Sequence, residues 1–112
     1  MNDKKQFYSE IIEIDSVFVA IDSLNASKEE KEHLKGMMAT TIHHAVLDTT
    51  MSQLSKVDKK TFLENLLSED HEKIWKLLDE KVKDAKTMIK HTGKELVEEF
   101  HKDIRSLKGK KS

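Results

Sequence analysis

The sequence predicts an all-α fold, a small bundle of three long helices and one short corner helix. Its 112 residues include no proline and only three glycines, and 37% of them are charged. This composition suits long, solvent-exposed helices and offers few turn-forming residues for a sheet. Apolar residues also recur at steps of three and four, the helical period. A chain of this length is expected to form one domain, here residues 1–107, followed by a disordered basic tail at 108–112.

The first helix is expected to run from about residue 7 to about residue 24. Its apolar residues repeat at steps of four and three: Phe7, Ile11, Ile14, Phe18 and Ile21. The many β-branched residues in this segment are a competing signal for a strand. However, the acidic residues do not alternate with the period of two that a half-buried strand requires. The pattern therefore favours a helix.

A second helix is expected over residues 28–54. Ser27 and Glu30 have the spacing of a capping box, in which a hydroxyl and a carboxylate satisfy free backbone N–H groups at a helix start. Apolar residues then fall on two faces of the segment. A helix that is apolar on two sides usually lies between two neighbours, so this segment is predicted to be the central helix.

Two adjacent histidines in this helix have different expected environments. His44 shares an apolar stripe with Met37, Leu47 and Met51. It is interpreted either as a packing residue or as a base or pH switch. His43 lies on the opposite side and is expected to face solvent.

A short corner helix and a long C-terminal helix are expected next. Asp58 is predicted to cap the corner helix, and Ser68 is the predicted cap of the following helix. Beyond Trp75, apolar residues continue at steps of three or four to Leu107. A continuous helix over 69–107 would be about 57 Å long, whereas a compact domain of about 100 residues has a radius of gyration of only about 13 Å. We therefore expect it to protrude, to bend near Gly93 or to meet a partner.

The second half of this segment carries the predicted partner-binding residues, because little chain is left to cover its apolar stripe. They are Ile89, Leu96, Phe100, Ile104 and Leu107. An uncovered apolar helix face is typical of an interaction site. The leading hypothesis is therefore a non-catalytic protein-interaction or self-associating module that binds a protein partner or a second copy of itself.

A metal-binding bundle is the alternative. Glu30 with His33, and Glu98 with His101, form two Glu-x-x-His pairs. Together with one Glu from each of two other helices, two such pairs can hold a di-iron or di-manganese centre when all ligands point inward. The first pair lies in a charged first turn, and the second flanks the apolar stripe instead of joining it. Most of these side chains are expected to face water. We accordingly expect no resident metal or other cofactor.

Composition and motifs argue against several other classes of protein. Twenty basic and 21 acidic residues leave a formal charge of −1, so nucleic-acid binding would depend on the tail lysines alone and is a second alternative. The chain has no cysteine, Gly-x-Ser-x-Gly elbow or glycine-rich phosphate loop, which argues against an enzyme. No apolar run reaches the roughly 20 residues of a membrane span, and no signal-peptide cleavage site follows the N-terminal lysines. A cytoplasmic protein is expected.

The layout between Leu24 and about Ile104 resembles that of a known family. The matching features are the cap and acidic start at 27–32, the helix end at 47–54 and the corner at 58–62. They resemble a family of short, uncharacterised all-helical bacterial proteins, a domain of unknown function. The resemblance implies no catalytic or binding residue, since that family has no assigned active site. The basic end after Ile104 departs from it.

Overall fold

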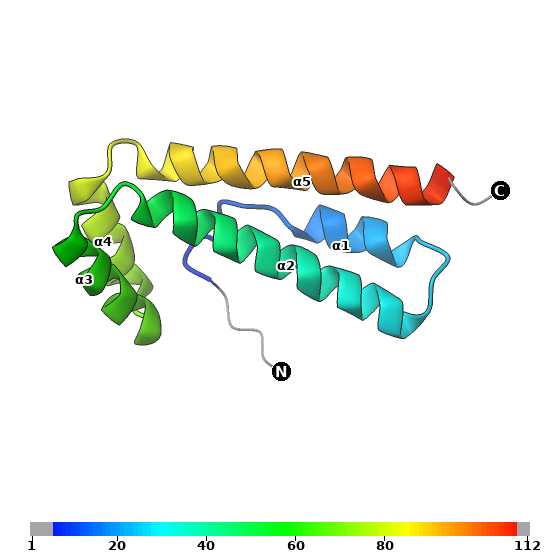
Figure 1. The fold of residues 1–112 in the computed structure, drawn as a ribbon, viewed down its shortest axis with the longest axis horizontal. Helices are drawn as coiled ribbons and strands as arrows, with labels where there is room; N and C mark the ends of the chain where they lie inside the picture. Colours follow the sequence, from blue (N-terminus) through cyan, green and yellow to red (C-terminus); the bar gives the residue numbers. More distant parts are fainter. Residues whose placement is uncertain (1–5, 110–112) are drawn as a thin grey trace.

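The computed structural model describes residues 6–109, in which every regular element is an α-helix and no strand occurs (Figure 1). It contains α1 (Asp15–Asp22), α2 (Lys28–Met51), α3 (Lys56–Leu67), α4 (His71–Lys81) and α5 (Ala85–Gly109). The all-α prediction is confirmed. Lys108 and Gly109, the first two residues of the expected tail, belong to α5, whereas 110–112 lie outside the described residues.

Three helices form the body of the molecule, and the other two close one end. Helices α1, α2 and α5 lie side by side along the long axis, while α3 and α4 pack against each other as a hairpin across one end (Figure 1). The principal extents are 53 × 28 × 21 Å, and the radius of gyration is 16.0 Å, above the roughly 13 Å of a compact chain of about this length. The protein is therefore elongated and has a large surface for its size.

The N-terminal segment is less helical than its apolar pattern predicts. Residues 7–12 form turns, and α1 covers only Asp15–Asp22. The β-branched residues that gave the strand signal also weaken a helix here. The turns bury Phe7, Tyr8 and Ile12 instead of a single helical stripe. The segment thus packs as an irregular strap on the helical body.

Helix α2 is the central helix, as expected. Its capping box is present: the Ser27 hydroxyl accepts from the Glu30 N–H at 3.1 Å, and the Glu30 carboxylate accepts from the Ser27 N–H at 2.9 Å. The helix packs on both α1 and α5. It ends at Met51, slightly earlier than predicted.

The caps of the two hairpin helices differ from the predicted residues. Ser55 caps α3 by accepting from the Asp58 N–H at 3.2 Å, so Asp58 lies inside the first turn. Asp70 caps α4 by accepting from the Lys73 N–H at 3.1 Å. Ser68 ends α3 instead of starting α4. The patterns indicated helix starts, but a neighbouring residue with the same chemistry supplies each cap.

The expected long C-terminal helix bends at residues 82–84, not at Gly93. Val82 has an extended backbone, and Asp84 has a positive φ of 52°. Asp is one of the few non-glycine residues that enter this left-handed region. Val82 and Ala85 are both buried on either side of the turn, which is why the apolar spacing continues through the bend and conceals it. Helix α5 then runs unbroken through Gly93.

An aromatic cluster ties the N-terminal strap to the hairpin. The Phe7 ring meets the rings of Tyr8, Phe62 and Trp75 edge-on, with centroids 5.2, 5.8 and 5.5 Å away. The Trp75 indole N–H also donates to the Phe7 carbonyl at 2.9 Å. Such contacts add to the burial of the rings. Trp75 therefore anchors the strap to α4.

Candidate functional site

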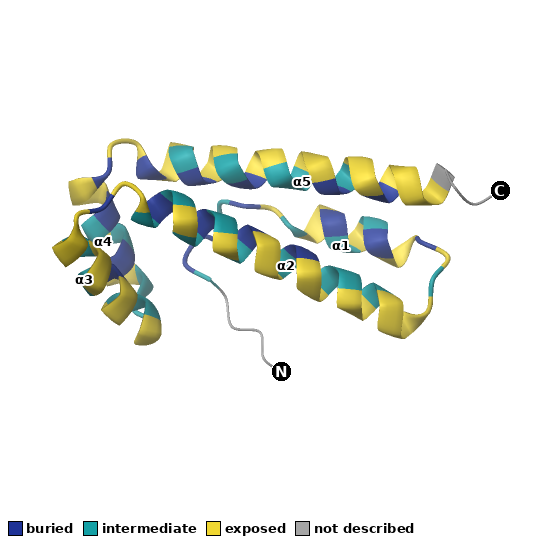
Figure 2. Ribbon diagram, in the orientation of Figure 1, coloured by how far each residue is buried: buried dark blue, intermediate teal, exposed yellow. Residues whose placement is uncertain are grey.

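The apolar stripe of α5 is covered within the chain. Ile89, Phe100 and Ile104 are buried (Figure 2), because α5 packs along both α1 and α2. The expectation that too little chain remains to cover this stripe is wrong. The stripe is covered because the chain turns at 82–84 and folds α5 back along the body. These three side chains are core residues and are not available to a partner.

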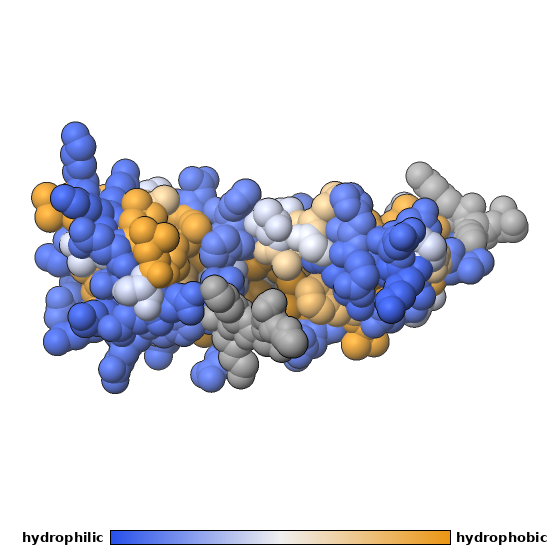
Figure 3. All heavy atoms as spheres, turned by 90° about the horizontal axis from the view of Figure 1, so that it is seen from below, coloured by the Kyte–Doolittle hydropathy of each residue, from blue (hydrophilic) through white to orange (hydrophobic). Residues whose placement is uncertain are grey.

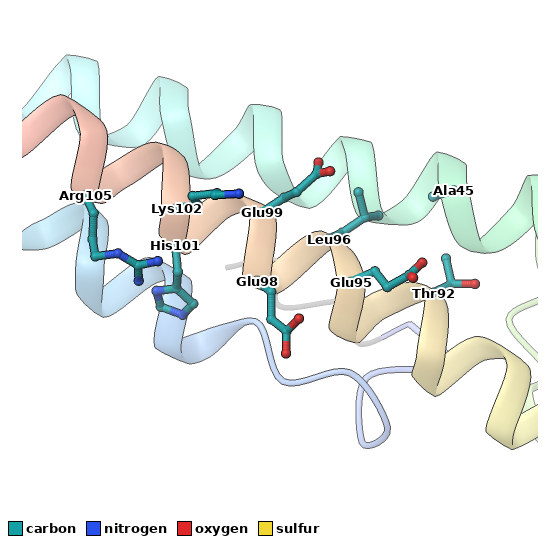
Figure 4. A pocket seen from close by; sticks show the side chains of 9 residues that line it. All are labelled: Ala45, Thr92, Glu95, Leu96, Glu98, Glu99, His101, Lys102 and Arg105. Carbon is teal, nitrogen blue, oxygen red and sulfur yellow. The ribbon is translucent and has the colours of Figure 1, made fainter.

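The other two predicted partner-binding residues are more accessible. Leu96 is half-buried and faces α2 (Figure 4). Leu107 is 46% exposed near the end of α5. Leu107 lines a hollow with Leu24, Leu34 and His33. Of the five predicted partner-binding residues, Leu107 in this last turn is the only one that is exposed, as the interaction hypothesis requires.

The structure does not bring the two Glu-x-x-His pairs together. Glu30 and His33 are exposed beside the α2 cap, where the Glu30 carboxylate is already engaged. Glu98 and His101 lie on the side of α5 that faces α1 and the N-terminal segment (Figure 4). His101 Nε2 lies 3.1 Å from the hydroxyl oxygen of Ser16 on α1. Over residues 6–109, no three His, Asp or Glu side chains are grouped closely enough to hold a metal ion. The four-ligand arrangement proposed from sequence is therefore not formed.

The environments of the two adjacent histidines are the reverse of those expected. His44 is exposed, whereas His43 is partly buried. His43 Nδ1 lies 2.8 Å from the hydroxyl oxygen of the buried Tyr8. The N-terminal strap causes the reversal, since its turns place Tyr8 over the side of α2 that a straight first helix would have left open.

Burial shifts both members of this pair toward their neutral forms. It raises the pKa of Tyr8 to about 12. Burial, and secondarily the charge of His44, lowers the pKa of His43. A histidine whose pKa is lower in the folded than in the unfolded chain binds fewer protons when folded, so its contribution to stability falls as pH drops below its ordinary value of about 6.5. The pair is therefore an acid-sensitive link between strap and body.

We expect His43→Asn to reduce the loss of stability on acidification. Asparagine retains a polar atom near the position of Nδ1 but does not titrate. The free energy of unfolding, measured by urea titration of Trp75 fluorescence, should differ between variant and wild type at pH 7.5, and this difference should shrink by pH 5. The exposed His33→Asn, ten residues away on the same helix, is the matched control and should keep the wild-type pH dependence. Equal pH dependence in wild type and His43→Asn would contradict the assignment.

The most exposed apolar surface lies on α3. We call its outward side the α3 outer face; its exposed members are Lys56, Val57, Lys60, Leu63, Glu64 and Leu67. Val57, Leu63 and Leu67 are 74, 42 and 85% exposed. Figure 3 shows apolar side chains gathered over the end of the molecule formed by the hairpin. Positions 56, 60, 63 and 67 follow the helical repeat and so share one side.

The sequence contained a signal for this surface in the apolar residues of the predicted corner helix, which were not assigned to separate sides. Phe62 with Leu66, and Leu63 with Leu67, are two pairs spaced by four residues and offset by one. Such pairs lie on adjoining sides of a helix. The structure buries Phe62, half-buries Leu66 and leaves Leu63 and Leu67 exposed. Helix α3 is thus apolar on two sides but has a neighbouring helix, α4, on only one.

A second surface feature lies between the N-terminal strap and α2. We call it the acidic hollow; its volume is about 640 Å³. Ile12, Ile14, Phe18 and Ile42 supply apolar wall, and the Tyr8–His43 pair lies within it. The exposed carboxylates are those of Glu10, Glu13 and Asp15. Within the described part of the chain, no lysine or arginine lines it.

Fold and surface together define an elongated helical protein with an apolar helix face open to solvent and, among residues 6–109, no group of three His, Asp or Glu side chains that could hold a metal ion. No protein-family model, curated protein or solved structure matches the chain. The resemblance to helical bacterial proteins of unknown function therefore stays a prediction. Among the described helices, none is both long and apolar enough to cross a membrane.

Proposed function

We propose that this chain is a non-catalytic protein-interaction module that binds through the α3 outer face. The observation that carries the proposal is the exposure of Val57, Leu63 and Leu67 on a single 12-residue helix. Single exposed apolar residues are ordinary, whereas grouped ones are typical of an interaction site. The proposal retains the module expected from sequence and moves its binding surface from the α5 stripe to α3.

The helical geometry supports a protein partner. A helix that is apolar on two sides usually lies between two neighbours, and α3 packs on α4 alone among the helices that it contacts extensively. Docking a partner on the open side would bury two leucines one turn apart. Complete burial of a fully exposed leucine contributes about 1.5–3 kcal/mol before the cost of association, so Leu67, which is 85% exposed, would contribute more than Leu63, which is 42% exposed.

Photo-crosslinking in cells tests the proposal. A photoreactive amino acid at Leu67 should form a discrete crosslinked species with a protein that mass spectrometry identifies. The matched control is the same amino acid at Val19, a 68% exposed apolar residue on α1. Binding of the purified partner should then weaken at least about tenfold in Leu67→Glu, because an unpaired charge would be buried, but not in Val19→Glu.

Two results would contradict the proposal. If Leu67 and Val19 give the same crosslinked species, or if Leu67→Glu binds the purified partner as tightly as wild type, α3 is not the binding surface. Because Leu67 is largely exposed, Leu67→Glu should change the free energy of unfolding by less than about 0.5 kcal/mol. An unaltered unfolding curve therefore separates lost binding from lost folding.

A further inference from the structure

The α3 outer face carries charge as well as apolar side chains. Lys56 and Lys60 lie on the same side of α3 as Leu63 and Leu67 and are exposed with them. Lys59 adds a third exposed lysine in the first turns of the helix, and Glu64 is the one exposed carboxylate of α3, so exposed lysines outnumber it three to one. The N-terminal end of a helix is itself electropositive. This surface therefore suits an occupant that is apolar with an acidic border.

The acidic hollow has the complementary character. Its wall offers Ile14 and Phe18, both only half-buried, to an incoming apolar side chain. Glu10 and Glu13 border it, and among residues 6–109 no lysine or arginine lines it; the Lys35 ammonium, 5.8 Å from the centre of the Phe18 ring, is paired with Asp22. Complementary charge steers association and fixes its register, while the apolar contacts supply most of the affinity.

From this complementarity we infer that the occupant of the acidic hollow is the α3 outer face of a second copy of this chain. The inference rests on the proposed function and names its partner. Leucines of α3 cover the apolar wall, and its lysines meet the carboxylates at the border. The contact joins two different surfaces and is therefore heterologous, so each copy has one surface of each kind to offer.

Charge reversal tests the contact without disturbing the core. The first variant is Lys56→Glu/Lys60→Glu on α3, and the second is Glu10→Lys/Glu13→Lys at the hollow; all four positions are exposed. Sedimentation velocity over the micromolar range should show self-association of the wild type that weakens at high salt, because salt screens exposed charges. Each variant alone should associate at least about tenfold more weakly, since like charges then face each other.

Mixing the two variants is the decisive experiment. The acidic α3 of the first variant fits the basic hollow of the second, and the unaltered surfaces also match, so the mixture should regain association although each variant alone has lost it. Lys90→Glu/Lys94→Glu, two exposed positions one turn apart on α5, is the matched control. This control should associate like the wild type.

Several outcomes would overturn the inference. A wild type that stays monomeric throughout the concentration range excludes a second copy as the occupant. A mixture no more associated than its components excludes the pairing of these two surfaces. Binding of a monomeric wild type to phosphatidylserine vesicles, lost in Lys56→Glu/Lys60→Glu, would assign α3 to lipid. If the chain is monomeric but Leu67 still crosslinks specifically to another protein, the inference fails and the proposed function stands.

Discussion

Replacing Phe100 with alanine is expected to lower the free energy of unfolding by about 3–5 kcal/mol. The Phe100 side chain is buried among the apolar residues of the core. Its removal deletes a large apolar group and leaves a space that well-packed neighbours fill only in part. Urea unfolding followed by circular dichroism measures the change.

Leu107→Ala is the control for Phe100→Ala, since it lies on the same helix but is 46% exposed. Its cost should be under about 1 kcal/mol. Comparing the two variants tests whether the apolar stripe of α5 belongs to the core or is open to a partner. A loss of less than about 1 kcal/mol in Phe100→Ala would instead mean that the stripe is available to a partner, as first expected.

The helical class and the central helix were predictable because both depend on local chemistry. A capping box needs only residues three apart, and Ser27 with Glu30 forms one. The apolar pattern of α2 likewise follows from helical spacing, and α2 contacts both α1 and α5 in the structure, although Met37 of the second apolar side is exposed. Composition without proline favours helices throughout.

The bend at 82–84 could not be predicted from the same kind of pattern. Val82 and Ala85 are both buried, so the apolar spacing continues across a turn that contains neither glycine nor proline. Asp84 adopts a positive φ, a conformation that tertiary packing selects and that no local spacing shows. The missed bend led directly to the mistaken expectation of an uncovered stripe.

The environment of His43 was inaccessible to sequence reasoning for a related reason. It depends on the strap, whose turns place Tyr8 against α2 across 35 residues of chain. The exposed leucines of α3 are different, because their spacing was visible in the sequence. The sequence does not show how many helices pack on α3. That number decides whether an apolar side of the helix is core or surface.

A single added methyl group at Gly93 is expected to destabilise the protein by about 1–2 kcal/mol. An alanine Cβ at this position would lie 2.6 Å from Ile12 Cδ1 and 2.8 Å from Cγ2, and closer still to Cγ1. Overpacking of a buried contact costs about 1–3 kcal/mol, which outweighs the gain of up to about 1 kcal/mol from replacing a helical glycine. Gly93 is therefore a point of close approach and not a hinge.

Gly36 supplies the matched control, because it also lies inside a helix but a Cβ there would meet no atom within 4 Å. Gly36→Ala should raise the free energy of unfolding by about 0.5–1 kcal/mol through helix propensity alone. The same substitution thus has opposite expected signs at the two glycines. Destabilisation at both positions, or at neither, would contradict this account.

A double-mutant cycle identifies the contact responsible. In an Ile12→Ala background the clash is removed, so Gly93→Ala should become neutral or stabilising, with a coupling energy of about 1–3 kcal/mol. Ile12 also forms part of the wall of the acidic hollow. If that hollow receives α3 of a second copy, Gly93→Ala should weaken self-association together with folding, whereas Gly36→Ala should leave self-association unchanged. The packing of one isoleucine against a glycine would then link the stability of the strap to the shape of the binding surface.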